Sequence, residues 1–346
     1  MSRDTRTSRT PLRLERTQIL AYRRGVQALD ERLRCRETSL RRAAWAGLQD
    51  SMPRAALLSI HARVDGTRPD ALDDRSLIQV WGPRFSTYVV AARDLAPFTL
   101  GRLPDDARRR QRAQDIAGRL HAFLDGRELG YAEAGRGLGI HPNALRYAAP
   151  TGTVLIRWDG ARQPTIRTVA APPVDPSGAR LELARRYLHV FGPTTADAFA
   201  EWAGIVQVAG PVAFEALGTT LTPVHTPIGD GWILAEDEPL FRAAAGPAAP
   251  ARLLPSGDTY FLLQGADREL LVPEANRRRL LWTSRVWPGA VLVAGEIVGT
   301  WRRAGSVVAI EPWRPRSSSE RDSIEAEAAS LPLPGVKGPI HVRWAD

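Results

Sequence analysis

Residues 183–204 read LARRYLHVFGPTTADAFAEWAG, and this stretch decides the fold. The spacing of the apolar residues in its first half predicts a helix over 181–191. A Gly-Pro pair ends that helix, because proline has no backbone N–H to continue the hydrogen-bond ladder. The two threonines that follow can cap a second helix over 196–202. Gly204 then marks a sharp turn, so the stretch predicts two helices and the turns that separate them.

The residues that follow complete a unit. A third helix is predicted over 211–217, and a hairpin-like stretch surrounds residues 229–232. Helices joined by a tight turn and followed by a β-hairpin are the order of a winged helix, in which the hairpin is the wing. We therefore interpret residues 177–245 as a winged-helix unit.

The same order of elements is predicted twice before this unit. In the first 104 residues we expect two helices within 12–48 that break near Thr38, a third over 54–59, and strands over 77–81 and 86–91. In the next segment we expect helices over 105–124, 128–134 and 142–147, and strands over 153–158 and 165–169 across an Asp-Gly turn. Three copies of one order favour a tandem array.

The last third of the chain has a different character. Short β-prone runs alternate with turns here, at 260–263, 269–272, 291–294, 297–301 and 307–311. We expect them to form a small β-barrel or sandwich. The tail contains one helical segment within 314–329 and should be peripheral. The predicted fold class is α+β, with domains over 1–104, 105–170, 177–245, 250–314 and 315–346.

The chain is strongly basic. Its 346 residues include 47 Lys or Arg against 38 Asp or Glu, which gives a net charge of +9. Lys337 is the only lysine, so nearly every basic residue is an arginine, and residues 1–48 carry 12 arginines against five acids. A positive field attracts polyanions, and the arginine fork matches phosphate geometry. The composition therefore favours nucleic acid as a partner.

Several other classes of function find no support. Cys35 is the only cysteine, so neither an intrachain disulfide nor a cysteine zinc cluster can form. The six histidines lack metal-ligand spacing, and no serine-hydrolase elbow or dinucleotide fingerprint is present. We expect neither a metal nor another cofactor. The start of the chain lacks an apolar signal segment and no apolar run could span a membrane, so we expect a cytoplasmic protein without membrane contact.

Five segments in a fixed order carry a resemblance to a known family. They are FTLGRLP at 98–104, the stretch 183–204, LLPSGDTY at 253–260, DRELLVP at 267–273 and VGTWRR at 298–303. Together they resemble the winged-helix family that contains the AlkZ-like and YcaQ-like DNA glycosylases. The resemblance covers about residues 12–313, and it implies three winged-helix units and a β domain that clasp duplex DNA. Catalysts of that family remove alkylated bases or unhook cross-links without a metal.

The resemblance also implies a catalytic signature: Gln or His, an apolar residue, then Gln or Asp, just after an apolar helix. The matching positions are His61, Ala62 and Arg63. Arg63 departs from the pattern, because arginine offers neither an acceptor nor an anion to a cationic transition state. We take His61 and Arg63 as candidate catalytic residues. His61 could equally be a hydrogen-bonded histidine at a helix end. An arginine at position 63 is more often a phosphate-binding or structural residue than a catalyst.

Four residues lie where the recognition helix of the second unit is expected: His141, Asn143, Arg146 and Tyr147. Asparagine and arginine can read base edges, and arginine and tyrosine can contact phosphates. A solvated helix face or an interface between units is the alternative reading. These four residues are candidate DNA contacts.

Two further groups are candidates for phosphate binding. Thr194 and Thr195 stand at a predicted helix start, where free backbone amides can hold a phosphate, although simple N-capping explains them more readily. Arg277, Arg278 and Arg279 form the densest basic cluster of the last third. A solvated charged face is the alternative for that cluster.

The leading interpretation is a monomeric protein that binds double-stranded DNA. It is either a metal-independent glycosylase with an altered His-Ala-Arg motif or a relative that binds DNA without catalysis. A transcription factor built from the same units is the alternative, and a dimer on a palindromic site would favour it. A third possibility is a scaffold without salt-dependent affinity for DNA.

Overall fold

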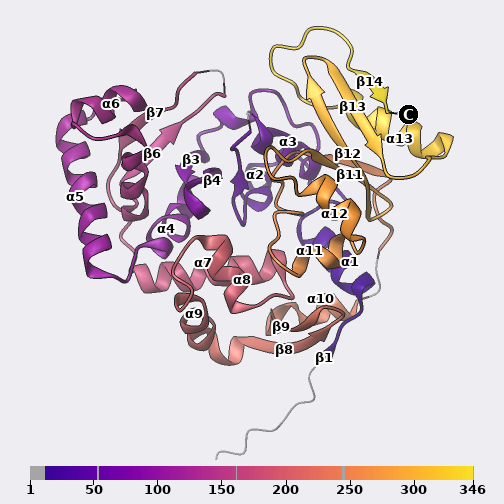
Figure 1. The fold of residues 1–346 in the computed structure, drawn as a ribbon, viewed down its shortest axis with the longest axis horizontal. Helices are drawn as coiled ribbons and strands as arrows, with labels where there is room; N and C mark the ends of the chain where they lie inside the picture. The colour runs from indigo at the N-terminus through magenta and orange to yellow at the C-terminus, as the bar shows by residue number, and fades with distance from the viewer. Residues whose placement is uncertain (1–11, 53, 161, 244–245, 346) are drawn as a thin grey trace, which may run out of the picture.

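The computed structural model describes residues 12–52, 54–160, 162–243 and 246–345. Helices surround three β-sheets, and the C-terminal sheet forms a lobe of its own at the upper right of Figure 1. The predicted α+β class is confirmed. Within those ranges, no helix is long and apolar enough to cross a membrane.

A six-stranded sheet joins the first and second predicted units. Its strands run in the order β2-β4-β3-β6-β7-β5. They are β2 (Leu48–Gln49), β3 (Leu77–Trp81), β4 (Thr87–Ala91), β5 (Leu129–Gly130), β6 (Val154–Arg157) and β7 (Thr165–Thr168). Both predicted hairpins, β3–β4 and β6–β7, are confirmed. Strands β3 and β6 pair through Gln79 and Ile156, which makes one sheet out of two hairpins.

The first half of the chain also contains helices of 4 to 18 residues. They are α1 (Arg16–Val26), α2 (Glu37–Ala43), α3 (Ala55–Arg63), α4 (Leu95–Phe98), α5 (Ala107–Leu124), α6 (Tyr131–Gly137) and the 3-10 helix η5 (Pro142–Thr151). The predicted helix over 128–134 begins late, because its first residues pair as strand β5. The predicted helix over 142–147 is the 3-10 helix η5, and Pro150 inside it supplies no amide for an α-helical bond.

The third predicted unit contains the stretch 183–204. Its elements are α7 (Pro176–Phe191), α8 (Ala196–Ala203), α9 (Ala209–Leu217), β8 (Leu221–Thr226), β9 (Gly229–Leu234) and α10 (Glu238–Arg242). The start of the chain returns to this unit, because β1 (Leu12–Arg13) pairs in parallel with β8. The buried Arg23 of α1 donates to the carbonyl oxygens of Phe191, Gly192 and Pro193.

The C-terminal lobe is a five-stranded sheet. Its strands, in sheet order, are β10 (Ala251–Leu254), β11 (Gly289–Val293), β12 (Glu296–Ala304), β13 (Val307–Pro312) and β14 (His341–Trp344). The last two are parallel. The segment 315–346, expected to be peripheral, contributes both β14 and helix α13 (Ser318–Ala329), and Ile324 and Ala328 of α13 are buried against the sheet.

Two predicted strands in this region are wrong. Residues 260–263 form no strand, and residues 269–272 belong mainly to helix α11 (Asp267–Leu271), which α12 (Ala275–Leu281) follows. All four side chains of 260–263 are buried in the main hydrophobic core. An apolar run that is buried on every side has the same composition whether or not it is a strand, so periodicity could not distinguish the two.

The main core gathers around helix α7. Tyr187 of this helix packs on Phe191 at a ring-centroid distance of 4.8 Å and on Trp202 of α8 at 5.0 Å. Phe199 of α8 is fully buried and contacts Tyr187 and Phe214. The opening stretch 183–204 therefore supplies the aromatic centre of the molecule.

Truncating this centre should destabilise the whole chain. We expect Phe199→Ala to lower the free energy of unfolding by about 3–5 kcal/mol, because the remaining side chains cannot fill the space left by the ring. Val208→Ala, at a position that is 69% exposed, should change it by less than about 0.5 kcal/mol. Urea unfolding followed by tryptophan fluorescence measures both, and equal losses would contradict the assignment of Phe199 to the core.

Candidate functional site

Arg63 lies at the C-terminal end of α3, a helix whose nine residues are all buried. Its two terminal nitrogens donate to the two carboxylate oxygens of Asp258, over 2.7 and 2.8 Å. They also donate to the Ser59 carbonyl and to the Gln27 side-chain oxygen, each over 2.9 Å. The residue is 1% exposed. The guanidinium is thus a cross-link between α3 and the loop after β10, and it faces no solvent.

His61 lies two residues earlier on α3 and contacts other groups. Its Nε2 is 3.0 Å from the Ser330 hydroxyl and 3.3 Å from Arg32. Burial, together with the charges of Arg32 and Arg252, lowers the pKa of His61 to about 3, so the ring is neutral at physiological pH. Its Nδ1 is buried and has no partner in the described part of the chain. His61 and Arg63 therefore share no partner and do not form one site.

A second group of polar side chains lies at the other end of α3. Asp50 follows β2 and is 1% exposed. Its Oδ1 accepts from the backbone N–H of Ala56, and its Oδ2 accepts from the Gln79 amide, each over 3.0 Å. Among the described residues it has no ion-pair partner. Burial raises the pKa of Asp50 to about 7, although the bond from Ala56 and the charge of Arg54 lower it.

Gln49 adds a second unusual group beside this carboxyl. Its side-chain Oε1 is buried and finds no donor within the described ranges. The same side chain lies against Gly257, where a β-carbon would come within 3.3 Å of its Nε2. A buried amide oxygen without a partner costs free energy, and such atoms call for an explanation such as a bound water or ligand.

Gln79 of β3 connects Asp50 to the second hairpin. Its Nε2 also donates to the Trp158 carbonyl over 3.0 Å, and its Oε1 accepts from the Trp158 backbone N–H over 2.6 Å. Gln79 and Trp158 line a cavity of about 140 Å³ that Arg54 and Arg157 also border. The arrangement places a carboxyl that titrates near neutral pH behind an amide that borders open space.

Gln49 and Asp50 were not predicted from the sequence. Two adjacent polar residues between Leu48 and the apolar run 55–58 were the available signal. Pairs of polar residues are also common in ordinary loops, and only its burial distinguishes this pair. Burial raises the pKa of Asp50 into the neutral range, and no local sequence pattern shows that burial.

The four candidates on η5 divide into two pairs. His141 caps the helix by accepting from the Asn143 backbone N–H, and the Asn143 side-chain oxygen accepts from the Tyr131 hydroxyl. Arg146 and Tyr147 instead surround Phe85 of the first hairpin, with the Arg146 guanidinium 5.8 Å from the Phe85 ring centroid. The structure thus brings the second pair into contact with the first unit.

The two threonines hold the start of α8. The Thr195 hydroxyl accepts from the Ala198 backbone N–H over 3.2 Å, so capping is the role that it fills. Thr194 is buried, exchanges both backbone hydrogen bonds with Trp232 and has its hydroxyl 3.2 Å from that of Tyr187. A role of either threonine in phosphate binding remains a prediction.

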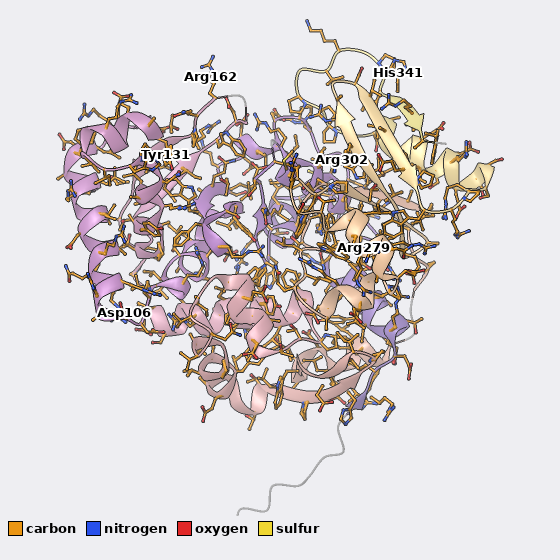
Figure 2. All side chains as sticks on the ribbon, in the orientation of Figure 1. Asp106, Tyr131, Arg162, Arg279, Arg302 and His341 are labelled. Atoms are coloured by element: carbon orange, nitrogen blue, oxygen red, sulfur yellow. The ribbon has the colours of Figure 1, made fainter. Side chains whose placement is uncertain are left out.

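The arginine cluster lies on helix α12. Arg277 pairs with Glu274 and lies over the Trp313 ring, and Arg278 donates to the Val272 carbonyl. Arg279 is exposed. Figure 2 labels Arg279 in the C-terminal half of the molecule and Tyr131 on the opposite side. The cluster is therefore remote from the η5 candidates.

The buried ion pair of Arg63 should be essential for stability. We expect Asp258→Asn to lower the free energy of unfolding by about 3–5 kcal/mol, because it leaves a buried guanidinium without its counter-charge. The double variant Arg63→Met, Asp258→Leu should recover part of that loss, since no charge is then buried. Urea unfolding measures both variants. A loss below about 1 kcal/mol for the single variant would refute this reading.

The pKa of Asp50 predicts a pH dependence of stability. The folded chain holds this proton up to about pH 7, whereas an unfolded aspartate loses it near 3.8, so this group makes the fold less stable as the pH rises between those values. The difference in unfolding free energy between Asp50→Asn and wild type should therefore change with pH. From pH 4 to 7 it should shift in favour of the variant by up to about 4 kcal/mol. Urea unfolding across pH measures this, with the exposed Asp322→Asn as a control that should parallel wild type. Parallel profiles for all three proteins would exclude the shift.

Comparisons with known proteins show which family this chain resembles. The family model described as "DNA glycosylase AlkZ-like" matches residues 42–332. The interstrand DNA cross-link repair glycosylase of Streptomyces sahachiroi is 28% identical over 162 residues, which are 45% of this chain and 43% of that protein, so the match spans less than half of the relative's length.

A solved structure is similar over nearly the whole chain. It is the Streptomyces sahachiroi DNA glycosylase AlkZ, with a TM-score of 0.76 and 18% identity, and the match covers 96% of this chain and all of the other. That likeness shows a common fold. The family match extends over most of the sequence and includes α3, Asp50 and Asp258. The chain belongs to the AlkZ-like DNA glycosylase family.

Proposed function

We propose that this chain hydrolyses the N-glycosidic bond of alkylated or cross-linked bases in duplex DNA, with Gln49 and Asp50 beside the reacting nucleotide. The observation that carries the proposal is the buried carboxyl of Asp50, which lacks a cationic partner among the described residues and has a pKa of about 7. The adjacent Gln49 has an unsatisfied side-chain oxygen that can accept from a water. Membership of a DNA glycosylase family supplies the reaction class.

The chemistry needs few groups. As the bond between C1′ and the base nitrogen breaks, the electron pair leaves with the base, and positive charge develops on the sugar. A water oxygen then bonds to C1′ and loses a proton. An ionised Asp50 would stabilise the developing cation and take up that proton, which is the role of a base with a pKa near the working pH. Gln49 would orient the water through its free oxygen.

Access to Asp50 would require a movement of Gln79. In the structure Gln79 covers Oδ2 of Asp50 with its amide while bonding to Trp158. A nucleotide turned out of the duplex could displace the Gln79 side chain and take its place at the carboxylate. This step makes Gln79 a positioning residue for the site.

We assign His61 and Arg63 to the support of this site. Arg63 ties α3 to Asp258 and has no exposed surface to offer a substrate. The neutral, buried His61 ties the same helix to Arg32 and Ser330. Both therefore fix α3, whose first turn supplies the Ala56 amide that holds Asp50.

The arrangement of the hairpins supports a mode of DNA binding. The hairpins β3–β4, β6–β7 and β8–β9 each follow short helices and would be the wings of three winged-helix units, with the C-terminal sheet as a barrel-like domain. We propose that one copy binds a duplex in the cytoplasm without a metal. Candidate contacts are His141, Asn143, Arg146, Tyr147, Thr194, Thr195 and Arg277, Arg278 and Arg279. Transcription regulation is less well supported, because it gives no role to a buried carboxyl that titrates near pH 7.

Base release from damaged duplexes tests the proposal. We expect wild type to release N3-methyladenine or N7-methylguanine, or to unhook an interstrand cross-link. Asp50→Asn should lower the single-turnover rate by about 10²–10⁴-fold and Gln49→Ala by about 10–10²-fold, with unchanged affinity for undamaged DNA. Asp322→Asn is the matched control and should retain the wild-type rate.

The pH profile of the same assay separates catalysis from folding. The wild-type rate should rise as the pH passes through about 7, because the carboxylate is the active form, and the residual rate of Asp50→Asn should be flat. No release from any lesion by wild type, or full activity of Asp50→Asn, would disprove the proposal.

A further inference from the structure

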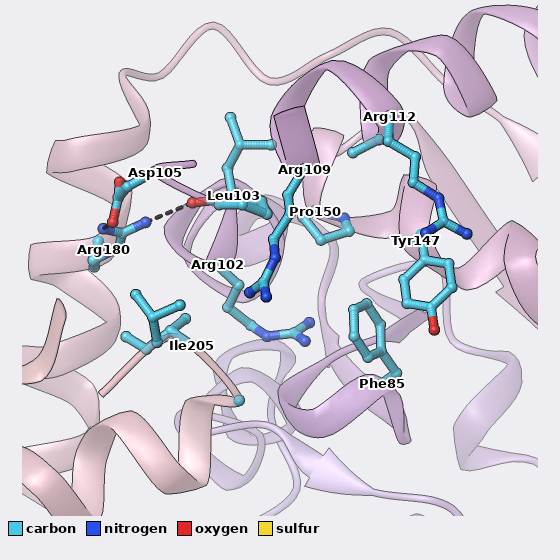
Figure 3. A pocket seen from close by; sticks show the side chains of 14 residues that line it. Phe85, Arg102, Leu103, Asp105, Arg109, Arg112, Tyr147, Pro150, Arg180 and Ile205 are labelled. Carbon is cyan, nitrogen blue, oxygen red and sulfur yellow. Dashed lines mark hydrogen bonds and ion pairs between the residues drawn. The ribbon is translucent and has the colours of Figure 1, made fainter. Parts of the chain in front are cut away.

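A basic cavity lies at the junction of the first three predicted units and shares no lining residue with the cavity beside Gln79. Its volume is about 260 Å³. Helix α5 lines one side, η5 another, and the turn after α8 closes it (Figure 3). The side chains of Arg102, Arg109, Arg112 and Arg180 all border it, against a single acidic residue, Asp105.

Arg102 is the buried arginine of this cavity, and hydrogen bonds hold its side chain in place. It is 4% exposed, and it donates from Nε to the Ala203 carbonyl over 2.7 Å and from Nη1 to the Trp81 carbonyl over 3.0 Å. No carboxylate in the described part of the chain is within ion-pair distance. Burial lowers the pKa of Arg102 to about 10, which leaves it charged at neutral pH. A buried cation without a counter-charge is costly, and an anion in the cavity would remove that cost.

Two further arginines reach the cavity from α5. Arg109 and Arg112 are exposed and three residues apart, so they share one face of the helix. The guanidinium groups of Arg102 and Arg109 converge in the middle of the cavity (Figure 3). The Arg112 guanidinium lies 4.8 Å from the Tyr147 ring centroid. Neither Arg109 nor Arg112 has a carboxylate partner among the residues that the structure describes, whereas Arg180 is neutralised by Asp105 over 2.6 Å.

The rest of the wall is apolar. It consists of Phe85, Leu103, Pro104, Ala113, Pro150, Ile205 and Val206. A phosphate ion alone would leave most of this surface unused. A phosphate attached to a planar aromatic group would contact both surfaces. The phosphate would bind the arginine side chains, and the aromatic group would cover the apolar wall.

We propose that this cavity binds a single nucleotide unit, with the phosphate held by Arg102 and Arg109 and the base packed against the apolar wall beside Tyr147. The nucleotide is either free or the phosphorylated end of a DNA strand. The site is separate from Gln49 and Asp50, and it does not depend on base excision. It gives the chain a second point of recognition for a phosphate on a terminal or free nucleotide.

Calorimetric titration of the full chain tests the proposal. We expect deoxyadenosine monophosphate to bind at least 10-fold more tightly than deoxyadenosine, and inorganic phosphate to compete with it. Arg109→Gln should weaken the binding of the nucleotide about 10-fold or more, because it removes a charged hydrogen-bond donor from an exposed position that does not support the fold. The neighbouring exposed Arg108→Gln, outside the cavity, is the matched control. Arg102→Gln should have a larger effect, and thermal unfolding reports whether that variant still folds.

Two short oligonucleotides distinguish the sources of the nucleotide. Competition by a 5′-phosphorylated single strand, without competition by the same strand with a 5′-hydroxyl, identifies a strand end. Competition by neither identifies the free nucleotide. Equal affinity for deoxyadenosine and its monophosphate, no binding at millimolar concentration, or equal effects of Arg109→Gln and Arg108→Gln would each overturn the proposal.

Discussion

The buried ion pair between Arg63 and Asp258 holds together parts of the chain that are 195 residues apart. Asp258 also accepts from the Ser59 hydroxyl and from the Tyr260 backbone N–H. The pair thus sets both the position of α3 and the path by which residues 260–263 enter the main core. Since the first turn of α3 supplies the amide that holds Asp50, the geometry of the candidate site depends on an interaction at the far end of the same helix.

Many of the arginines that make this chain basic are structural. Arg23, Arg63, Arg102 and Arg186 are all buried, and their donors satisfy backbone carbonyls or carboxylates. Planar guanidinium groups suit this use, because each presents several donors in fixed directions. A high arginine content therefore describes how the units are joined as much as which partner they attract. Arg23 and Arg102 both lack a carboxylate partner within the described ranges, and Arg102 in addition borders the basic cavity.

Prediction from sequence succeeded where local chemistry decides the structure. The hairpin across Asp159-Gly160 and the cap of α8 at Thr195 follow from turn and cap residues. It failed at 260–263, where burial on all sides hides the periodicity. Asp50 could not be found, because its partners Ala56 and Gln79 depend on how α3 and β3 pack. His61 fits a motif position and Arg63 departs from it, but a motif does not say which side of a helix faces the core.

Contacts between the N-terminal residues and residues far along the chain affect how the protein folds during synthesis. Strand β1 requires β8, Arg23 requires the carbonyls of residues 191–193, and Arg63 requires Asp258. A nascent chain therefore cannot complete its N-terminal third until about three quarters of it has left the ribosome. Until then, the apolar face of α3 and the buried arginines remain in water, which is the condition under which chaperones bind emerging chains.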